Sequence, residues 1–376
     1  MKPATLAAQA LGWIEPSARS ITPAIYPATT FERGADGGYP GGHSYARDQN
    51  PTYDQAEALL AQLEGGAGAL LFASGMAAAA TLLDALPQGA HVIAPEQMYW
   101  VLRTWMLQLA DAGRLAIEFV PNGALDVLRD RLRPGQTRLV WVETPANPMC
   151  AITDIAATAD LAHHAGALVA ADSTLSTPVH CRPIDFGADL VMHSATKQLN
   201  GHADVLAGAL VTARADETWE RIRRERAMRG AVLGTFEAWL LLRGMRTLYL
   251  RVMASARSAR HIADVLQGHS RVAQTLYPGL PDHPGHEIAR RQMQNGFGAL
   301  VSFRVRGGEP AARQVVANLK LFKDATSLGG VESLVEHRAL VEGATSKVPR
   351  DLLRLSIGIE DADDLADDLV QALDRL

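Results

Sequence analysis

Two apolar runs of this chain end in side chains that can do chemistry. One run covers residues 167–171 and is followed by Asp172, and the other leads into Ser194, Thr196 and Lys197. In an open α/β sheet, the residues just beyond the carboxyl ends of strands line the ligand crevice. We therefore expect a lysine, a carboxylate and two hydroxyl groups to face one site.

These side chains suit pyridoxal 5′-phosphate (PLP). A lysine amine forms a Schiff base with its aldehyde, a carboxylate such as Asp172 balances a protonated pyridine nitrogen, and the hydroxyl groups of Ser194 and Thr196 bind its phosphate. Taken alone, the position of Lys197 is more typical of a solvated lysine after a strand than of a cofactor-binding lysine. The prediction of a cofactor lysine therefore depends on other motifs.

The segment Ser74-Gly75-Met76 lies between an apolar run and an alanine-rich helical pattern. A helix beginning there has free N–H groups that stabilise an anion, and Gly75 lets the backbone approach closely. An ordinary strand-to-helix turn has the same pattern. Together with Lys197, the segment predicts the phosphate site.

Further motifs occur in order over nearly the whole chain. They are Tyr45-Ala-Arg47, Asn50-Pro51-Thr52, Leu63-Glu64-Gly65-Gly66, Ser74-Gly75-Met76, Glu143-Thr-Pro-Ala-Asn147-Pro148, Asp172, Ser194-Ala-Thr196-Lys197, Ser327-Leu-Gly-Gly-Val-Glu332-Ser333-Leu and Arg354-Leu-Ser-Ile-Gly-Ile-Glu360. This series resembles the Cys/Met-metabolism (transsulfuration) family of PLP-dependent enzymes, which includes cystathionine γ-synthase and the cystathionine β- and γ-lyases. The resemblance implies the α/β PLP-dependent transferase fold of the aspartate aminotransferase type.

The resemblance also implies roles for residues around the cofactor. Tyr45 and Arg47 would reach the phosphate from a neighbouring subunit, in a homo-oligomer built as a dimer of dimers with shared active sites. Tyr99 would stack on the cofactor ring and assist proton transfer. Lys197 would hold the cofactor and move protons between substrate carbons. The residues Asp48 and Gln49 depart from the family pattern.

On the substrate side, the resemblance implies four residues. Asn147 matches a residue that hydrogen-bonds the cofactor 3′-oxygen, and Ser327 begins the motif that follows. Glu332 matches a position that handles the distal end of the substrate, and Arg354 would grip the α-carboxylate as a bidentate fork. The chain has Arg338 where many family members have proline.

The order of patterns predicts three parts. Residues 1–50 lack periodicity, and residues 33–43 hold five glycines and a proline, which indicates an N-terminal arm or loop. Short apolar strands alternate with helices in residues 51–245, which indicates a large domain with a mostly parallel sheet. Residues 246–376 have segregated helices and strands, which favours a smaller α+β domain.

Composition excludes several other functions. A net charge of −5 gives no footprint for nucleic acid, and no run approaches the length of a membrane span, so we expect a cytoplasmic protein without nucleic-acid or membrane partners. The cysteines do not form a zinc motif. We interpret His193 and His202 as structural, residues 221–226 as a solvated helix face, and the acidic residues 361–368 as a first helical turn, and we predict no metal site.

We therefore predict a PLP enzyme that eliminates or replaces a group at Cβ or Cγ of a small sulfur-containing or O-acylated amino acid. Glu332 favours the cystathionine γ-synthase or lyase type. The open alternatives are an aminotransferase and an activity like that of methionine γ-lyase or O-acetylhomoserine sulfhydrylase. An oxidoreductase is disfavoured because Gly66-Ala-Gly68 precedes the strand and lacks the third glycine of a dinucleotide loop.

Overall fold

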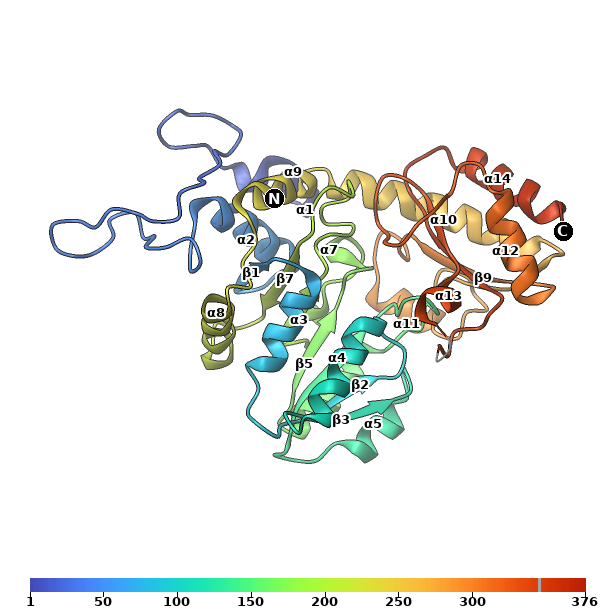
Figure 1. Ribbon diagram of the computed structural model, residues 1–376, viewed down its shortest axis with the longest axis horizontal. Helices are drawn as coiled ribbons and strands as arrows, with labels where there is room; N and C mark the ends of the chain where they lie inside the picture. The colour runs from blue at the N-terminus through green and yellow to red at the C-terminus, as the bar shows by residue number, and fades with distance from the viewer. Residues whose placement is uncertain (344–345) are drawn as a thin grey trace.

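Two β-sheets organise the chain (Figure 1). The computed structural model describes residues 1–343 and 346–376. The first sheet lies in the first two thirds of the sequence, and the second is formed by the C-terminal third. The sequence prediction of an α/β architecture with a large, mostly parallel sheet and a smaller C-terminal unit is confirmed.

The large sheet has seven strands among the described residues, in the order β1-β7-β6-β5-β4-β2-β3. Strands β2 to β6 are parallel, whereas β7 runs antiparallel to both β6 and β1. The carboxyl ends of the parallel strands β2 to β6 therefore meet at one edge of the sheet. The strands are β1 (Gly68–Phe72), β2 (His91–Pro95), β3 (Ala116–Val120), β4 (Thr137–Glu143), β5 (Leu168–Asp172), β6 (Leu190–His193) and β7 (Gly208–Thr212).

Helices cover both faces of this sheet, because its strands are apolar on both sides. On β6, Leu190 and Met192 join one core cluster with α3, α4 and α8, while Val191 joins another with α2 and α9. The helices of this region are α2 (Pro51–Glu64), α3 (Gly75–Asp84), α4 (Trp100–Asp111), α5 (Leu125–Arg131), α6 (Ile155–His164), α7 (Thr177–His180), η2 (Pro183–Phe186), α8 (Glu217–Arg229) and α9 (Thr235–Met245).

The smaller sheet has the order β10-β11-β12-β9-β8. On β12, Leu353 and Leu355 face the core formed with α10, α12 and α14, so the intervening Arg354 faces the other side. The elements are α10 (Leu248–Gly268), β8 (Val272–Leu276), α11 (His286–Gln292), β9 (Leu300–Val305), α12 (Gly308–Asn318), β10 (Lys323–Asp324), β11 (Leu334–Glu336), α13 (Arg338–Glu342), β12 (Leu352–Ser356) and α14 (Ala362–Asp374).

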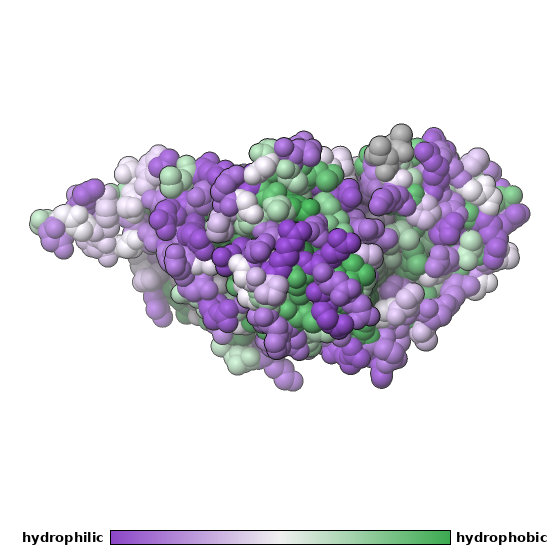
Figure 2. All heavy atoms as spheres, turned by 90° about the horizontal axis from the view of Figure 1, so that it is seen from below, coloured by the Kyte–Doolittle hydropathy of each residue, from purple (hydrophilic) through white to green (hydrophobic). Residues whose placement is uncertain are grey.

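The N-terminal segment, for which the sequence predicts an arm or loop over residues 1–50, begins with two short helices. These are α1 (Pro3–Gln9) and η1 (Ala10–Gly12). Ala7 and Ala10 are buried in the core cluster of α2, so packing stabilises a helix that lacks a long periodic pattern. The following segment projects from the body in Figure 1, and its protruding tip is hydrophilic to neutral in Figure 2.

The basic residues of α8 are not all solvated. Arg226 is 4% exposed, and its guanidinium donates to Glu57 at 2.8 Å and to the carbonyl of Asp48 at 3.0 Å. The prediction of a solvated face for residues 221–226 is therefore wrong at this position. The salt bridge replaces the hydration that burial removes, and it ties α8 to α2 and to the base of the arm.

No helix among the described residues combines the length and the apolar character that a membrane crossing needs.

Candidate active site

A cavity of about 400 Å³ lies at the carboxyl edge of the large sheet, against the smaller sheet. This volume is within the range of small-molecule sites. Most of the predicted site residues line it, namely Ser74, Gly75, Met76, Tyr99, Asn147, Asp172, Ser194, Thr196, Lys197, Ser327 and Arg354. Segments far apart in the sequence therefore meet here as predicted.

Lys197 projects into this cavity after β6, and its Nζ donates to Ser327 Oγ at 2.7 Å. Burial, and then the charge of the nearby Arg354 guanidinium, lower the pKa of Lys197 to about 8, while Glu336 opposes the change. A larger share of this amine is therefore neutral near pH 7 than for a solvated lysine. A neutral amine is the form that attacks a carbonyl carbon.

Asp172 ends β5 and faces the same cavity. Its Oδ1 accepts the backbone N–H of Thr174 at 3.0 Å and the Thr174 hydroxyl at 2.5 Å. Burial raises the pKa of Asp172, and these hydrogen bonds oppose that rise. In the described part of the chain, no cationic side chain forms a salt bridge with Asp172. Its carboxylate therefore has hydrogen bonds from Thr174 but no cationic partner among the described residues.

Glu143 lies beside Asp172 on the neighbouring strand β4. Burial and then the charge of Asp172 raise the pKa of Glu143 to about 8. Its two oxygens accept the backbone N–H groups of Tyr99 at 2.7 Å and Asn147 at 3.0 Å. Glu143 thus positions two of the predicted site residues, a role that the sequence analysis did not assign.

The start of α3 forms a strand-to-helix turn at the residues predicted to bind the phosphate. Ser74 caps the helix by accepting the N–H of Ala77 at 3.0 Å, while the N–H groups of Gly75 and Met76 have no backbone acceptor among the described residues. A Cβ atom on Gly75 would lie 2.9 Å from the Cβ of Ser194. Glycine therefore lets the turn and the Lys197 segment approach each other closely.

The two hydroxyl groups before Lys197 have different environments. Thr196 donates to the carbonyl of Ala207 at 3.1 Å and accepts its N–H at 2.9 Å. Ser194 uses its backbone N–H to donate to the Thr174 hydroxyl at 2.8 Å. The Thr196 hydroxyl is therefore engaged in hydrogen bonds with the backbone of Ala207. The hydrogen bond of Ser194 uses its backbone and leaves its hydroxyl available for the predicted phosphate.

His193 ends β6 just before Ser194 and is buried against Glu64. Its Nε2 contacts Glu64 Oε1 at 2.6 Å, and neither side chain is exposed. His193 also opposes the rise in the pKa of Asp172 that burial causes. His202 contacts the carbonyl of Asn200 at 2.8 Å. Both histidines thus have structural partners, and His193 in addition influences the carboxylate predicted to bind the pyridine nitrogen.

Arg354 enters the cavity from the smaller sheet. It is 1% exposed and donates to the Ser327 carbonyl at 2.9 Å and to Glu336 Oε2 at 2.6 Å. Glu336 lies directly opposite Arg354 on the antiparallel strand β11. Arg338 also lines the cavity. The sequence analysis missed Glu336, although period-two alternation from Leu334 would have placed it on the side of Arg354.

Three predicted residues do not line this cavity. Tyr45 is 46% exposed and Arg47 lies over its ring at 5.4 Å, both in the projecting arm. Glu332 is exposed outside the cavity. The roles of Tyr45 and Arg47 in a neighbouring subunit, and of Glu332 at the distal end of the substrate, stay predictions.

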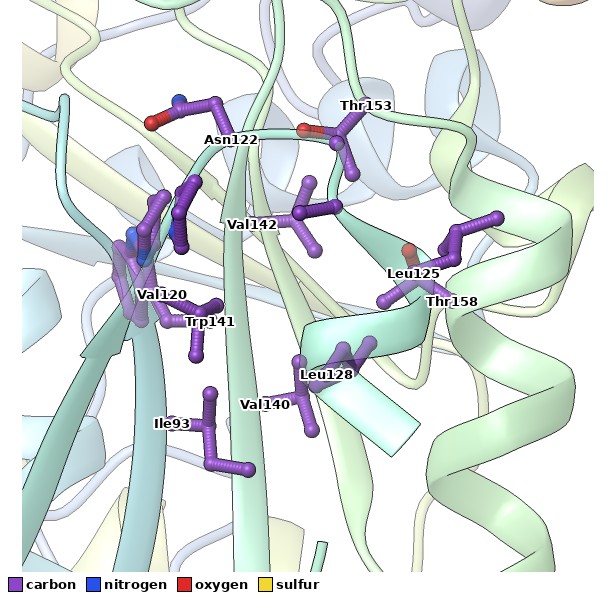
Figure 3. A pocket seen from close by; sticks show the side chains of 14 residues that line it. Ile93, Val120, Asn122, Leu125, Leu128, Val140, Trp141, Val142, Thr153 and Thr158 are labelled. Atoms are coloured by element: carbon purple, nitrogen blue, oxygen red, sulfur yellow. The ribbon is translucent and has the colours of Figure 1, made fainter. Parts of the chain in front are cut away.

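A second pocket is apolar and lies between β2, β4 and α5 (Figure 3). Its walls include Ile93, Leu128 and Val140, and none of the described side chains that line it is titratable. It therefore lacks the acids, bases and cations that the cavity around Lys197 brings together.

Comparisons with known proteins agree with this geometry. The model of the Cys/Met metabolism PLP-dependent enzyme family matches residues 4–374. The chain belongs to this family. Cystathionine gamma-synthase of Mycobacterium tuberculosis (strain ATCC 25618 / H37Rv) is 44% identical over 379 residues, which cover 99% of this chain and 96% of that protein. Cystathionine gamma-lyase of Bacillus subtilis (strain 168) is 39% identical over 369 residues, which cover 95% of each.

Solved structures of the family have the same fold. The cystathionine gamma synthase from Xanthomonas oryzae pv. oryzae in complex with cystathionine has a TM-score of 0.95 and 39% identity, covering 100% of this chain and 98% of that one. This chain is a PLP-dependent enzyme, and the cavity fits the cofactor. Asp172 lacks a cationic partner among the described residues, and the buried Asn147 Oδ1 lacks a donor there. A protonated pyridine nitrogen and the ring substituents would satisfy such groups.

Proposed function

We propose that this chain eliminates or replaces a group at Cβ or Cγ of a sulfur-containing or O-acylated amino acid. It is a transsulfuration enzyme of the cystathionine γ-synthase or γ-lyase type. The observation that carries the proposal is the convergence of Lys197, Asp172 and Arg354 on one cavity, with Lys197 Nζ 2.7 Å from Ser327 Oγ. These groups supply an amine, an anion and a carboxylate-binding cation.

The residues of the cavity would hold the cofactor at three points. The N–H groups of Gly75 and Met76 and the Ser194 hydroxyl bind the phosphate, and Asp172 keeps the pyridine nitrogen protonated. Tyr99, which immediately precedes α4, stacks on the ring. When bound, PLP supplies an electron sink that stabilises negative charge at the substrate Cα.

The substrate is bound and deprotonated by residues of both sheets. Arg354 binds the α-carboxylate through the donors that Glu336 leaves free, which orients the Cα–H bond. Lys197 Nζ, once free, takes the proton from Cα and returns protons to the side-chain carbons. Its pKa of about 8 lets it serve as base and as acid near neutral pH.

The arm would complete the phosphate site of a neighbouring subunit. Tyr45 and Arg47 are held outside their own cavity, and the arm projects from the body (Figure 1). This arrangement supports a homo-oligomer, a dimer of dimers, in which each pair of subunits shares its active sites. A two-fold axis would bring each arm to the other subunit in the same way.

Product analysis tests the activity. Purified holoenzyme is incubated with L-cystathionine, and separately with L-cysteine and O-succinyl- or O-acetyl-L-homoserine, and the products are separated by chromatography. We expect a keto acid, ammonia and a thiol from elimination, or cystathionine from replacement. Conversion of PLP to pyridoxamine phosphate with an amino-group acceptor, without either product, would instead identify an aminotransferase and overturn the proposal.

A further inference from the structure

Arg251 is a buried arginine on the first turn of α10. Its side chain is 8% exposed. Burial lowers the pKa of Arg251 to about 10, and no carboxylate among the described residues opposes that change. A buried cation without an anionic partner costs free energy. The hydrogen bonds of its guanidinium must therefore offset the loss of hydration.

The guanidinium of Arg251 donates to the segment that follows Lys197. Its Nη1 donates to the carbonyl of Gln198 at 2.9 Å, and its Nη2 donates to the carbonyl of Leu199 at 3.4 Å. Gln198 is 5% exposed and Leu199 is 1% exposed, so water has little access to these carbonyls. Buried carbonyl groups need donors, and Arg251 supplies one to each.

The same guanidinium is anchored where α9 ends and α10 begins. Its Nη2 also donates to the carbonyl of Gly244 at 2.7 Å, and its Nε donates to Thr247 Oγ1 at 3.0 Å. Arg251 therefore joins the turn after Lys197 to the end of α9 and to the start of α10. A planar guanidinium can make these contacts together because its donors point in several fixed directions.

Two glycines provide the space for this arrangement. Gly201 has a φ of 76°, and a Cβ atom there would overlap the Arg251 guanidinium. A Cβ atom on Gly244 would lie 2.9 Å from the Cα of Asn200 and would overlap the Asn200 carbonyl oxygen. Side chains at these positions would separate the turn after Lys197 from α9. Both glycines therefore allow the close approach that the contacts of Arg251 require.

The helix that carries Arg251 extends from the large sheet to the smaller one (Figure 1). Its start joins the core cluster of α2 and α9 through Leu248, and its second half joins the core of the smaller sheet through Ile262. Arg251 thus holds the turn after Lys197 against the helix that packs on both cores. The smaller sheet also carries Arg354, which is proposed to bind the substrate carboxylate.

We propose that Arg251 is a positioning residue that fixes the turn after Lys197 and thereby holds the Lys197 amine in its reactive position. This inference rests on the proposed function, in which Lys197 carries the cofactor and moves protons. Arg251 is not among the described residues that line the cavity, so it acts through the backbone. A shift of ~1 Å in a reacting group can slow a reaction by about 100-fold.

Cofactor binding to the apoenzyme separates positioning from folding. Covalent uptake of PLP requires the Lys197 amine, whereas pyridoxine 5′-phosphate has an alcohol in place of the aldehyde and binds only noncovalently. We expect Arg251→Met to bind pyridoxine 5′-phosphate within about threefold of wild type, measured by equilibrium titration. Its uptake of PLP at pH 8, measured by stopped-flow absorbance, should be at least tenfold slower. Uptake at the wild-type rate, or an equal loss in both measurements, would overturn the proposal.

Arg251→Lys tests whether charge alone is sufficient. Lysine keeps the positive charge, but its donors are all on one nitrogen, which cannot reach the carbonyls of Gln198 and Gly244 together. We expect this variant to take up PLP as slowly as Arg251→Met does. Recovery of the wild-type rate would contradict the positioning role. Arg257→Met, which alters an exposed arginine on the same helix, is the control and should behave as wild type.

Thr247→Val provides the test in a protein that keeps the buried arginine. The substitution removes the acceptor of Arg251 Nε, and it removes no helix cap because the Thr247 side chain makes no capping hydrogen bond. We expect PLP uptake to slow at least threefold with unchanged affinity for pyridoxine 5′-phosphate. Wild-type uptake in this variant would count against the orientation of the guanidinium as the cause.

The position of the covalent label distinguishes failure of this inference from failure of the proposed function. Borohydride reduction of the wild-type holoenzyme, followed by peptide mapping, identifies the lysine that carries PLP. A label on another lysine would overturn the proposed role of Lys197 and this inference with it. A label on Lys197, together with equal uptake rates of wild type and Arg251→Met, would overturn only the role of Arg251.

Discussion

The carboxylate of Glu143 accepts the backbone N–H of Tyr99 at 2.7 Å, across 44 residues of sequence. Its other oxygen accepts the N–H of Asn147 at 3.0 Å. Glu143 ends β4 directly beside Asp172 at the end of β5, so one side chain links Tyr99, proposed to stack on the ring, to the edge of the sheet that carries Asp172. A residue at the end of a strand of the large sheet thus fixes the backbone position of Tyr99.

Glu143→Gln should disturb this connection. A glutamine has one accepting oxygen, so its NH₂ group would face one of the two N–H groups and displace Tyr99 or Asn147. We expect kcat to fall at least tenfold while PLP still binds, measured by steady-state kinetics and cofactor absorbance. Glu220→Gln, which alters an exposed glutamate that pairs with Arg223, is the matched control. Unchanged kcat in Glu143→Gln would remove the positioning role.

Asp172→Asn should retain PLP but lose turnover. The variant has no anion to keep the pyridine nitrogen protonated, so negative charge at Cα loses its stabilisation. We expect kcat to fall at least 100-fold, equivalent to about 3 kcal/mol of barrier at ~1.4 kcal/mol per tenfold. Asp126→Asn, which alters an exposed carboxylate on α5, should behave as wild type. Turnover within a few-fold of wild type would contradict the role of Asp172.

The pKa of Lys197 predicts how the apoenzyme takes up PLP. The neutral amine reacts, so the rate of covalent uptake should rise with pH, reach half its maximum near pH 8 and level off above it. Stopped-flow absorbance measures this profile. Borohydride reduction and peptide mapping should locate a pyridoxyl group on Lys197. A midpoint near the ordinary lysine value of 10.5, or a label on another lysine, would disagree with the structure.

The lowered pKa of Lys197 also makes the stability of the apoenzyme depend on pH. The folded pKa of Lys197 is below the unfolded value of 10.5, so the unfolded chain binds more protons between about pH 8 and 10.5. In this window, Lys197 should make the free energy of unfolding of the apoenzyme rise with pH. Urea unfolding of wild type and Lys197→Met at several pH values measures the difference, which should shrink as the pH increases.

Gly208 on β7 should be intolerant of a side chain. An added Cβ atom would lie 2.0 Å from the carbonyl oxygen of Ser74 and 2.8 Å from the nitrogen of Gly75. Gly208→Ala should push the proposed phosphate turn out of place and weaken PLP binding at least tenfold. Gly268→Ala, where a Cβ atom has no neighbour within 4 Å, is the control. Equal PLP affinities of the two variants would count against the turn as the phosphate site.

The proposed sharing of active sites predicts complementation between subunits. A protomer with Tyr45→Phe and Arg47→Ala, and a protomer with Lys197→Ala, should each be nearly inactive. In a mixed dimer, one of the two sites combines an intact Lys197 with an intact arm, so activity should return after subunit exchange. No recovery despite proven exchange, or a fully active monomer, would contradict the shared site.

Local sequence patterns determined the order of helices and strands in the large sheet and the segments that meet in its cavity. Lys197 and Asp172 were placed together correctly because the carboxyl ends of parallel strands share one edge. The turn at Gly75 was predictable because a strand-to-helix junction leaves N–H groups free. The family resemblance added Arg354, which local periodicity alone did not distinguish from an arginine at a strand edge.

Only the tertiary structure decided which distant side chains pair. Arg226, predicted to be solvated, is buried against Glu57, which lies 169 residues away. The buried pair of His193 and Glu64 and the position of Arg338 beside Glu336 likewise became visible only in the fold. Periodicity specifies which face of an element is buried, but it does not specify which polar groups meet there. Which polar groups pair depends on how the elements pack. A buried charge requires a partner, and the packing of the chain determines which residue lies close enough to be that partner.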